Sequence, residues 1–263
     1  MPTLVWICNP FAGLDLQSKP FSSCQKPQPK LGLDLGLTSG LDCKSSPALS
    51  KPFKLNTHKI MTNYLYKNDL PANLNLGNSI AIDTETMGLN IKRDRLCLMQ
   101  ISSGDGNAHL IQFEQGNYQA PNLKKLLSDE KILKIFHFAR FDVATIKHHL
   151  EIDLKNIYCT KIASRLVRTY TDAHGLKSLC DELLGIDLSK KQQSSDWGNV
   201  EINEKQIDYA ASDVLYLHRL KTRLDDMIRR ENREEILKAC LEFLPTRCTL
   251  DLEGFASVDI FSH

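Results

Sequence analysis

The 263-residue sequence lacks several features that would assign it to a specialised class of protein. It has eight cysteines but no pair spaced C-x-x-C, so a zinc site is not indicated. Cysteines inside apolar stretches, such as Cys97, are interpreted as reduced, small hydrophobic residues. No apolar run approaches the ~20 residues that cross a bilayer, and no basic segment precedes the short apolar start. We therefore expect a cytoplasmic protein without a membrane anchor.

A strong excess of charge of either sign is also absent. The formal net charge is +1, which excludes a polybasic binder of nucleic acid or membranes. The first 60 residues carry seven lysines and three aspartates, whereas residues 61–263 carry 26 basic and 29 acidic residues, a balance near −3. A groove that follows many phosphates normally has an excess of Lys and Arg. The second part of the chain therefore need not hold a long strand.

The first 60 residues have no regular hydrophobic period. They contain seven of the ten prolines but no glutamate and no arginine. Such a segment cannot bury enough apolar surface to offset its chain entropy. We predict a disordered, low-complexity extension over residues 1–60, with Met61 as an alternative start, and a single folded domain over residues 61–263.

From Ser79 onward the hydrophobic pattern becomes regular. Runs of apolar and β-branched residues predict strands at Ser79–Thr84, Leu96–Ser102, Ala108–Phe113 and Ile132–Phe138, with an extended piece near Ile157–Cys159. Helices are predicted at Ala120–Ser128, Phe141–Leu150, Thr160–Tyr170, His174–Leu184 and Asn203–Phe243, the last broken near Arg230–Asn232. This order indicates an α/β fold, a mixed sheet with helices on both faces.

Two carboxylates stand at the end of the first of these strands. Side chains two apart on a strand share a face, so Asp83 and Glu85 project together. Carboxylates on one face repel each other unless a cation lies between them, and hard cations such as Mg²⁺ and Mn²⁺ prefer oxygen ligands. Alone, the pair also fits a solvated strand end.

Two further signals follow along the chain. Asp142 comes five residues after His137, where a strand ends and a helix begins, although an aspartate there can also simply cap the helix. Tyr209 and Asp213 are four residues apart on a predicted helix and so share a face, although a half-buried tyrosine beside a surface aspartate is equally ordinary. The three signals together are far more specific than each one alone.

In this order and spacing, the residues resemble the three motifs of the DEDD superfamily of 3′→5′ exonucleases, tyrosine subclass, in its ribonuclease D-like branch. The resemblance covers about Met61 to His263. More closely, the sequence is similar to the short alphaproteobacterial enzymes called nanoRNase C. The stretches that carry this likeness are Asp83–Leu89, Arg93–Cys97, Lys134–Phe138, Cys159–Ser164, Gln192–Trp197 and Tyr209–Leu217.

The resemblance implies a ribonuclease H-like fold and a two-metal hydrolysis of terminal phosphodiester bonds, with nucleoside 5′-monophosphates as products. Four carboxylates would hold two Mg²⁺ or Mn²⁺ ions: Asp83 bridging both, Glu85 and Asp213 on one, and Asp142 on the other. Tyr209 would orient the attacking water.

The resemblance also implies residues that bind the substrate. Leu89 matches a leucine that wedges between the terminal bases, although a core leucine is the alternative. The backbone of Thr86 and Met87 would contact the terminal 3′ hydroxyl. His137 either contacts the substrate or supports the carboxylates.

Three other positions have weaker signals. Trp197 is expected to brace the loop before the Tyr209 helix, with base stacking as the alternative. His174 fits a local polar role near a helix start. The pair Lys190–Lys191 fits phosphate contact and a solvated charge pair equally well.

Several functional alternatives remain open at this point. A ribonuclease D that trims tRNA 3′ ends is the main one, but only 50 residues follow Asp213, too few for the helical domains that such enzymes add. An inactive nucleic-acid-binding module would have lost at least one carboxylate, and all four are present. The choice between short RNA and short DNA stays open, and the resemblance implies a homo-oligomeric ring, with eight subunits expected.

Overall fold

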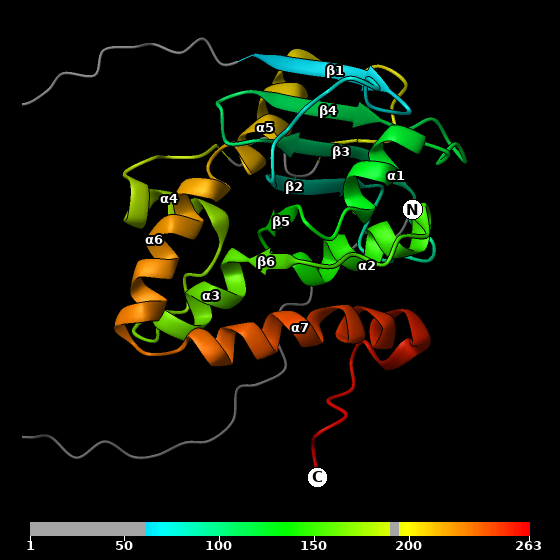
Figure 1. The fold of residues 1–263 in the computed structure, drawn as a ribbon. Helices are drawn as coiled ribbons and strands as arrows, with labels where there is room; N and C mark the ends of the chain where they lie inside the picture. Colours follow the sequence, from blue (N-terminus) through cyan, green and yellow to red (C-terminus); the bar gives the residue numbers. More distant parts are fainter. Residues whose placement is uncertain (1–61, 190–194) are drawn as a thin grey trace, which may run out of the picture. The chain divides into compact units, whose positions relative to one another are not determined.

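The computed structural model describes residues 62–189 and 195–263 of the chain (Figure 1). The predicted extension over residues 1–60 and the pair Lys190–Lys191 lie outside the described residues.

Within the described residues, six strands form one mixed sheet in the order β1-β4-β3-β2-β5-β6. The strands are β1 (Asn63–Lys67), β2 (Ser79–Thr86), β3 (Leu96–Ser102), β4 (Ala108–Gln112), β5 (Leu133–Phe136) and β6 (Ile157–Cys159). Strand β3 pairs antiparallel with both of its neighbours, whereas β1 with β4, β2 with β5, and β5 with β6 are parallel. Every residue of β3 is buried, as expected for a central strand covered on both faces.

Helices cover the sheet on both faces. They are α1 (Pro121–Ser128), α2 (Ala139–Leu150), α3 (Thr160–Val167), α4 (Leu176–Leu184), α5 (Glu204–Leu215), α6 (Leu217–Arg230) and α7 (Glu234–Leu250), followed by a π-helical turn at Asp251–Phe255. Figure 1 shows α3, α4 and α6 grouped together, with α7 running beside β6. Among the described helices, none has both the length and the apolar character that crossing a membrane requires.

The alternation of side chains along β2 divides the core into two layers. Ile80 and Ile82 pack into a cluster with residues of α1, α2 and the end of α7. Ala81 packs on the opposite face, into a cluster built mainly from α3, α4, α5 and α6. Because side chains alternate across a strand, Asp83 and Glu85 follow Ala81 onto the face that α5 covers.

The predicted α/β fold is confirmed, with corrections to individual elements. Strand β1 was not predicted, because its short, half-exposed sequence at the sheet edge carries little apolar signal. The long helix predicted at Asn203–Phe243 is three helices: one break lies at Tyr216 and another at residues 231–233, and α7 continues to Leu250 through Pro245. The remaining predicted boundaries differ by a few residues, which is the usual uncertainty at element ends.

A deletion tests the predicted boundary between the extension and the domain. The two core clusters of the described residues run from Leu70 to Cys248. We expect a variant lacking residues 2–60 to keep its helical circular dichroism and to melt within about 2 °C of the full chain, since 1 kcal/mol corresponds to roughly 2–4 °C in a domain of this size. A variant lacking residues 2–68, which also loses β1, is the control and should be clearly destabilised. Unfolding of the shorter deletion would contradict the boundary.

Candidate active site

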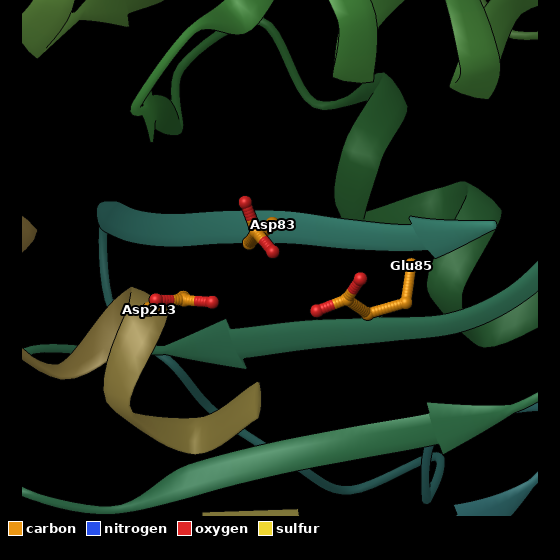
Figure 2. A group of neighbouring side chains, drawn as sticks. All are labelled: Asp83, Glu85 and Asp213. Atoms are coloured by element: carbon orange, nitrogen blue, oxygen red, sulfur yellow. The ribbon is translucent and has the colours of Figure 1, made fainter. Parts of the chain in front are cut away.

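Three carboxylates from two distant parts of the chain meet beside the sheet. Asp83 and Glu85 extend from β2, and Asp213 extends from α5 (Figure 2). One oxygen of each can be chosen so that all three lie within 4.8 Å of one another. The sequence predicted the pair on β2, and the structure brings Asp213 to it.

The start of α5 sets the position of Asp213. Asn203 caps the helix, because its side chain accepts a hydrogen bond from the backbone N–H of Gln206 (3.1 Å), while the Gln206 side chain accepts one from the backbone N–H of Asn203 (3.0 Å). Such a capping box fixes where a helix begins. Tyr209 and Asp213 then lie on one face, and the Tyr209 hydroxyl donates a hydrogen bond to the Asp213 carboxylate.

Asp142, the fourth predicted carboxylate, lies in the first turn of α2 and is buried. Its Oδ1 accepts hydrogen bonds from the Thr84 backbone N–H (3.1 Å) and the Thr84 hydroxyl (2.7 Å). Thr84 stands between Asp83 and Glu85 on β2, so the second motif is joined directly to the first. Asp142 is not one of the three residues within 4.8 Å, but its charge acts on both Asp83 and Glu85.

Burial and mutual repulsion make all four carboxylates unusually reluctant to ionise. Burial raises the pKa of Asp83 well above its ordinary value, and the charges of Asp142, Asp213 and Glu85 raise it further. Burial, with the charges of Asp213 and Asp142, also raises the pKa of Glu85. Burial raises the pKa of Asp142 to about 7 against the hydrogen bonds from Thr84, and that of Asp213 to about 7 against the hydrogen bond from Tyr209.

This donor set fits divalent cations. In the chain's described parts, no basic side chain forms an ion pair with Asp83, Glu85, Asp142 or Asp213. Converging carboxylates without a basic partner are costly when ionised, and a cation removes the cost. Carboxylate oxygens are the ligands that Mg²⁺ and Mn²⁺ prefer.

Of the predicted substrate residues, Met87 and Leu89 lie on the loop that follows β2, and Thr86 is the last residue of that strand. Leu89 is 82% exposed and Met87 is 58% exposed, so Leu89 is not a core leucine. The Thr86 hydroxyl donates a hydrogen bond to the Gly88 carbonyl. The β2–β3 register shifts between Glu85 and Thr86, and this irregularity directs the chain into the loop.

The remaining predicted residues have structural contacts. Nδ1 of His137 lies 2.8 Å from the Thr160 hydroxyl, and burial, with the charge of Lys161, lowers the His137 pKa to about 3, so its ring is neutral. Trp197 is buried with its ring 6.2 Å from that of Tyr209, as expected for a bracing residue. Nδ1 of His174 lies 2.9 Å from the Ser164 hydroxyl.

Sequence reasoning missed two residues that adjoin the site. Thr84 holds Asp142, and its position inside the D-x-E motif was the available signal. Gln100 stands opposite Asp83 in the β2–β3 pairing and is fully buried, yet its amide has no hydrogen-bond partner among the described residues. No sequence signal distinguishes Gln100 from the rest of a buried strand.

Comparison with known proteins agrees with this geometry. A protein-family model described as 3′-5′ exonuclease matches residues 59–229, a stretch that contains Asp83, Glu85, Asp142, Tyr209 and Asp213. The chain belongs to the 3′-5′ exonuclease family. The resemblance found in the sequence is thereby confirmed.

The chain is similar to solved structures of related exonucleases. The structure of Brucella melitensis NrnC bound to pGG is 55% identical, with a TM-score of 0.73; the match covers 77% of this chain and 99% of the Brucella chain. A second structure of that protein, with bound Mg²⁺, is 54% identical, covers 77% and 100% of the two chains, and has the same TM-score of 0.73. The curated ribonuclease D of Zymomonas mobilis is 29% identical over 179 residues, and the chain spans only 46% of its length.

Removing one carboxylate tests the electrostatics of the site. A folded-state pKa near 7 against an ordinary 3.8 means that Asp213 is neutral in the folded protein at pH 5 but ionised at pH 8, so its burial destabilises the metal-free fold as pH rises. In chelator, we expect Asp213→Asn to raise the melting temperature by roughly 3–6 °C at pH 8, or about 1–2 kcal/mol, and by less at pH 5, because the penalty builds up from the ordinary pKa of 3.8 to the folded pKa of about 7.

Metal should reverse the order of stability. At pH 8, adding Mn²⁺ should raise the melting temperature of the unsubstituted protein, by about 2.7 kcal/mol at a concentration 100 times Kd, and should raise that of Asp213→Asn less. Equal shifts in both proteins, measured by scanning fluorimetry, would show that Asp213 does not hold metal.

Proposed function

We propose that this chain hydrolyses very short oligonucleotides from the 3′ end, with dinucleotides as preferred substrates and nucleoside 5′-monophosphates as products. The observation that carries the proposal is the 55% identity to Brucella melitensis NrnC, a protein solved with the dinucleotide pGG, across 99% of that protein's length. The balance near −3 over residues 61–263 also favours a substrate with few phosphates over a long polyanion.

The carboxylates are assigned to two divalent ions, Mg²⁺ or Mn²⁺. Asp83 would contribute to both ions, Glu85 and Asp213 to one, and Asp142, held by Thr84, to the other. When bound, the ions supply a stronger nucleophile and stabilise the charge on the phosphate and the leaving oxygen.

Tyr209 is assigned to orientation of the attacking water. Burial first, and then the charges of Asp213, Glu85 and Asp83, raise the pKa of Tyr209, so its hydroxyl stays protonated and can donate a hydrogen bond. The hydroxyl is already directed toward Asp213 by their hydrogen bond. A donor held in one orientation beside the carboxylates lowers the entropy cost of placing water for attack.

The loop after β2 is assigned to the 3′-terminal nucleotide. The exposed Leu89 side chain would lie against the terminal bases, and the backbone of Thr86 and Met87 would contact the 3′ hydroxyl. His137 is assigned to support of the carboxylates, because its neutral ring contacts Thr160, and substrate contact remains the alternative.

Ribonuclease D-type trimming of tRNA is the second candidate, because several curated relatives are ribonucleases D. The identity to these relatives, 27–29%, is about half of that to the dinucleotide-bound protein, and the chain spans less than half of their length. An inactive binding module is disfavoured because all four carboxylates and Tyr209 are present.

We also propose that the protein forms a homo-oligomeric ring in the cytoplasm, with eight subunits expected, in which a neighbouring subunit supplies positive groups to the 5′ phosphate. A dinucleotide offers few contacts to one subunit, so a second subunit would add affinity without lengthening the groove. Multi-angle light scattering of the purified protein measures the subunit number, and a monomer would contradict the proposal.

Substitutions separate catalysis from metal binding. Asp213→Ala and Asp142→Ala should reduce cleavage to background, because each removes an ion ligand. Tyr209→Phe should lower kcat by roughly 10–100-fold and leave the Mn²⁺-induced melting shift intact, because only a hydroxyl is lost. Tyr216→Phe, at the junction of α5 and α6, is the matched control and should retain full activity. Full turnover by Tyr209→Phe would exclude the assigned role.

Substrate length distinguishes the two enzymatic candidates. We expect kcat/KM to be highest for a 5′-phosphorylated dinucleotide and to fall about 10-fold without the 5′ phosphate, a loss of about 1.4 kcal/mol. Each phosphate held on a single strand contributes about −0.7 to the slope of log K against log salt, so the slope should be shallow. Equal rates on the dinucleotide, its dephosphorylated form and a 20-mer, with a steep salt slope, would favour ribonuclease D-type trimming. RNA and DNA series should be run in parallel.

A further inference from the structure

The leucine assigned to the substrate stands on a tightly closed loop. Residues 87–95 join β2 to β3, and the Met87 N–H donates a hydrogen bond to the Arg95 carbonyl (3.1 Å), which closes the base of the loop. Leu89 lies near the tip with 82% of its surface exposed. An exposed leucine gains nothing from packing in the free protein, so its position depends on contacts made by its neighbours.

Asp94 makes the contact on one side of Leu89. Its carboxylate Oδ2 accepts a hydrogen bond from the Asn90 N–H (2.9 Å), and its own N–H donates to the Asn90 carbonyl (2.7 Å). The residue is only 8% exposed, although it lies in a surface loop. Asp94 therefore fixes both the N–H and the carbonyl of Asn90, the residue immediately after Leu89.

The same carboxylate also lies against Gly88, the residue before Leu89. A Cβ added at Gly88 would lie 2.4 Å from Oδ2 and 2.9 Å from Cγ of Asp94, so only a glycine allows the carboxylate to approach this closely. The residues before and after Leu89 thus both meet Asp94. Leu89 is held by a contact on each side, and its own side chain is left free.

Arg93 keeps this carboxylate in place. Its Nε lies 2.6 Å from Oδ1 and its second nitrogen donor lies 2.8 Å from Oδ2, a bidentate pair. The hydrogen bonds from Arg93 and Asn90 hold the pKa of Asp94 below its ordinary value, so the carboxylate is ionised at neutral pH. The Arg93 side chain is 73% exposed, so its contribution to stability is that of a surface ion pair.

We propose that Asp94 is a positioning residue that sets the place of Leu89 and thereby the affinity for the 3′-terminal bases. The inference rests on the proposed function, in which Leu89 contacts those bases. Asp94 has no contact with Asp83, Glu85, Asp142 or Asp213 among the described residues, so it acts on substrate binding and not on the ion-holding carboxylates.

A double-mutant cycle tests this role. On a 5′-phosphorylated dinucleotide, Asp94→Ala should raise KM about 5–20-fold, change kcat less than about 3-fold, and leave the Mn²⁺-induced melting shift unchanged. Leu89→Ala should raise KM similarly. The combination should be no worse than Leu89→Ala alone, because Asp94 acts through Leu89. Asp153→Ala, which removes an exposed aspartate from an ion pair with Lys147, is the matched control.

Gly88→Ala gives a second route to the same result, since it displaces the Asp94 carboxylate without removing it. It should raise KM as Asp94→Ala does. Added to Asp94→Ala, it should raise KM little further. Circular dichroism and melting curves confirm that each variant is folded. This pair keeps the test decisive if Asp94→Ala does not fold.

The outcomes separate the inference from the proposed function. Additive effects of Asp94→Ala and Leu89→Ala, or a fall in kcat at constant KM, would overturn the positioning role while Leu89→Ala still weakens binding. An unchanged KM in Leu89→Ala would show that Leu89 does not contact the terminal bases. That result would overturn the inference even if dinucleotides are hydrolysed. Failure of the unsubstituted protein to hydrolyse dinucleotides would instead refute the proposed function itself.

Discussion

Repulsion between carboxylates is the constraint on which the rest of this structure depends. Asp83, Glu85 and Asp213 bring ligand oxygens within 4.8 Å of one another, and Asp142 adds its charge to Asp83 and Glu85. Groups that repel do not gather unless the surrounding structure holds them, because each would gain by separating or by taking up a proton. The fold must therefore stabilise this arrangement through contacts elsewhere.

The elements that carry Asp83, Glu85 and Asp213 are held by strand pairing, helix capping and burial. Strand β2 lies inside the sheet between β3 and β5, so the backbone of Asp83 and Glu85 is fixed by pairing. Helix α5 begins at a capping box and buries Ala210, Ala211 and Val214 against the sheet. The same negative potential also repels phosphate, so the proposed hydrolysis requires cations at the site. The proposed preference for a substrate with few phosphates and the proposed need for divalent ions then both follow from the negative charge of the carboxylates.

Much of this could be predicted from the sequence, because the relevant spacing is local. Side chains two residues apart on a strand share a face, so Asp83 and Glu85 project together whatever the tertiary structure. Side chains four residues apart on a helix also share a face, which places Tyr209 beside Asp213. Each motif was ambiguous alone, and their joint order along the chain made the resemblance specific.

What could not be predicted depends on contacts between distant segments. The hydrogen bonds from Thr84 to Asp142 cross 58 positions of sequence, and the burial of Gln100 opposite Asp83 follows from strand pairing. The exposure of Leu89 was likewise open, since an isolated leucine fits a core as well as a surface. Strand β1 was missed because pairing with β4, and not apolar periodicity, makes it a strand.

The separation of the carboxylates along the chain has a consequence during synthesis. β2 is made early, α2 later and α5 much later, so a growing chain holds Asp83 and Glu85 long before Asp213 exists. Contacts between distant segments form only after the intervening chain is available to close the loop. A nascent chain therefore has no complete ion site until α5 has left the ribosome and docked on the sheet. The carboxylate cluster is thus completed only after most of the sheet has been made.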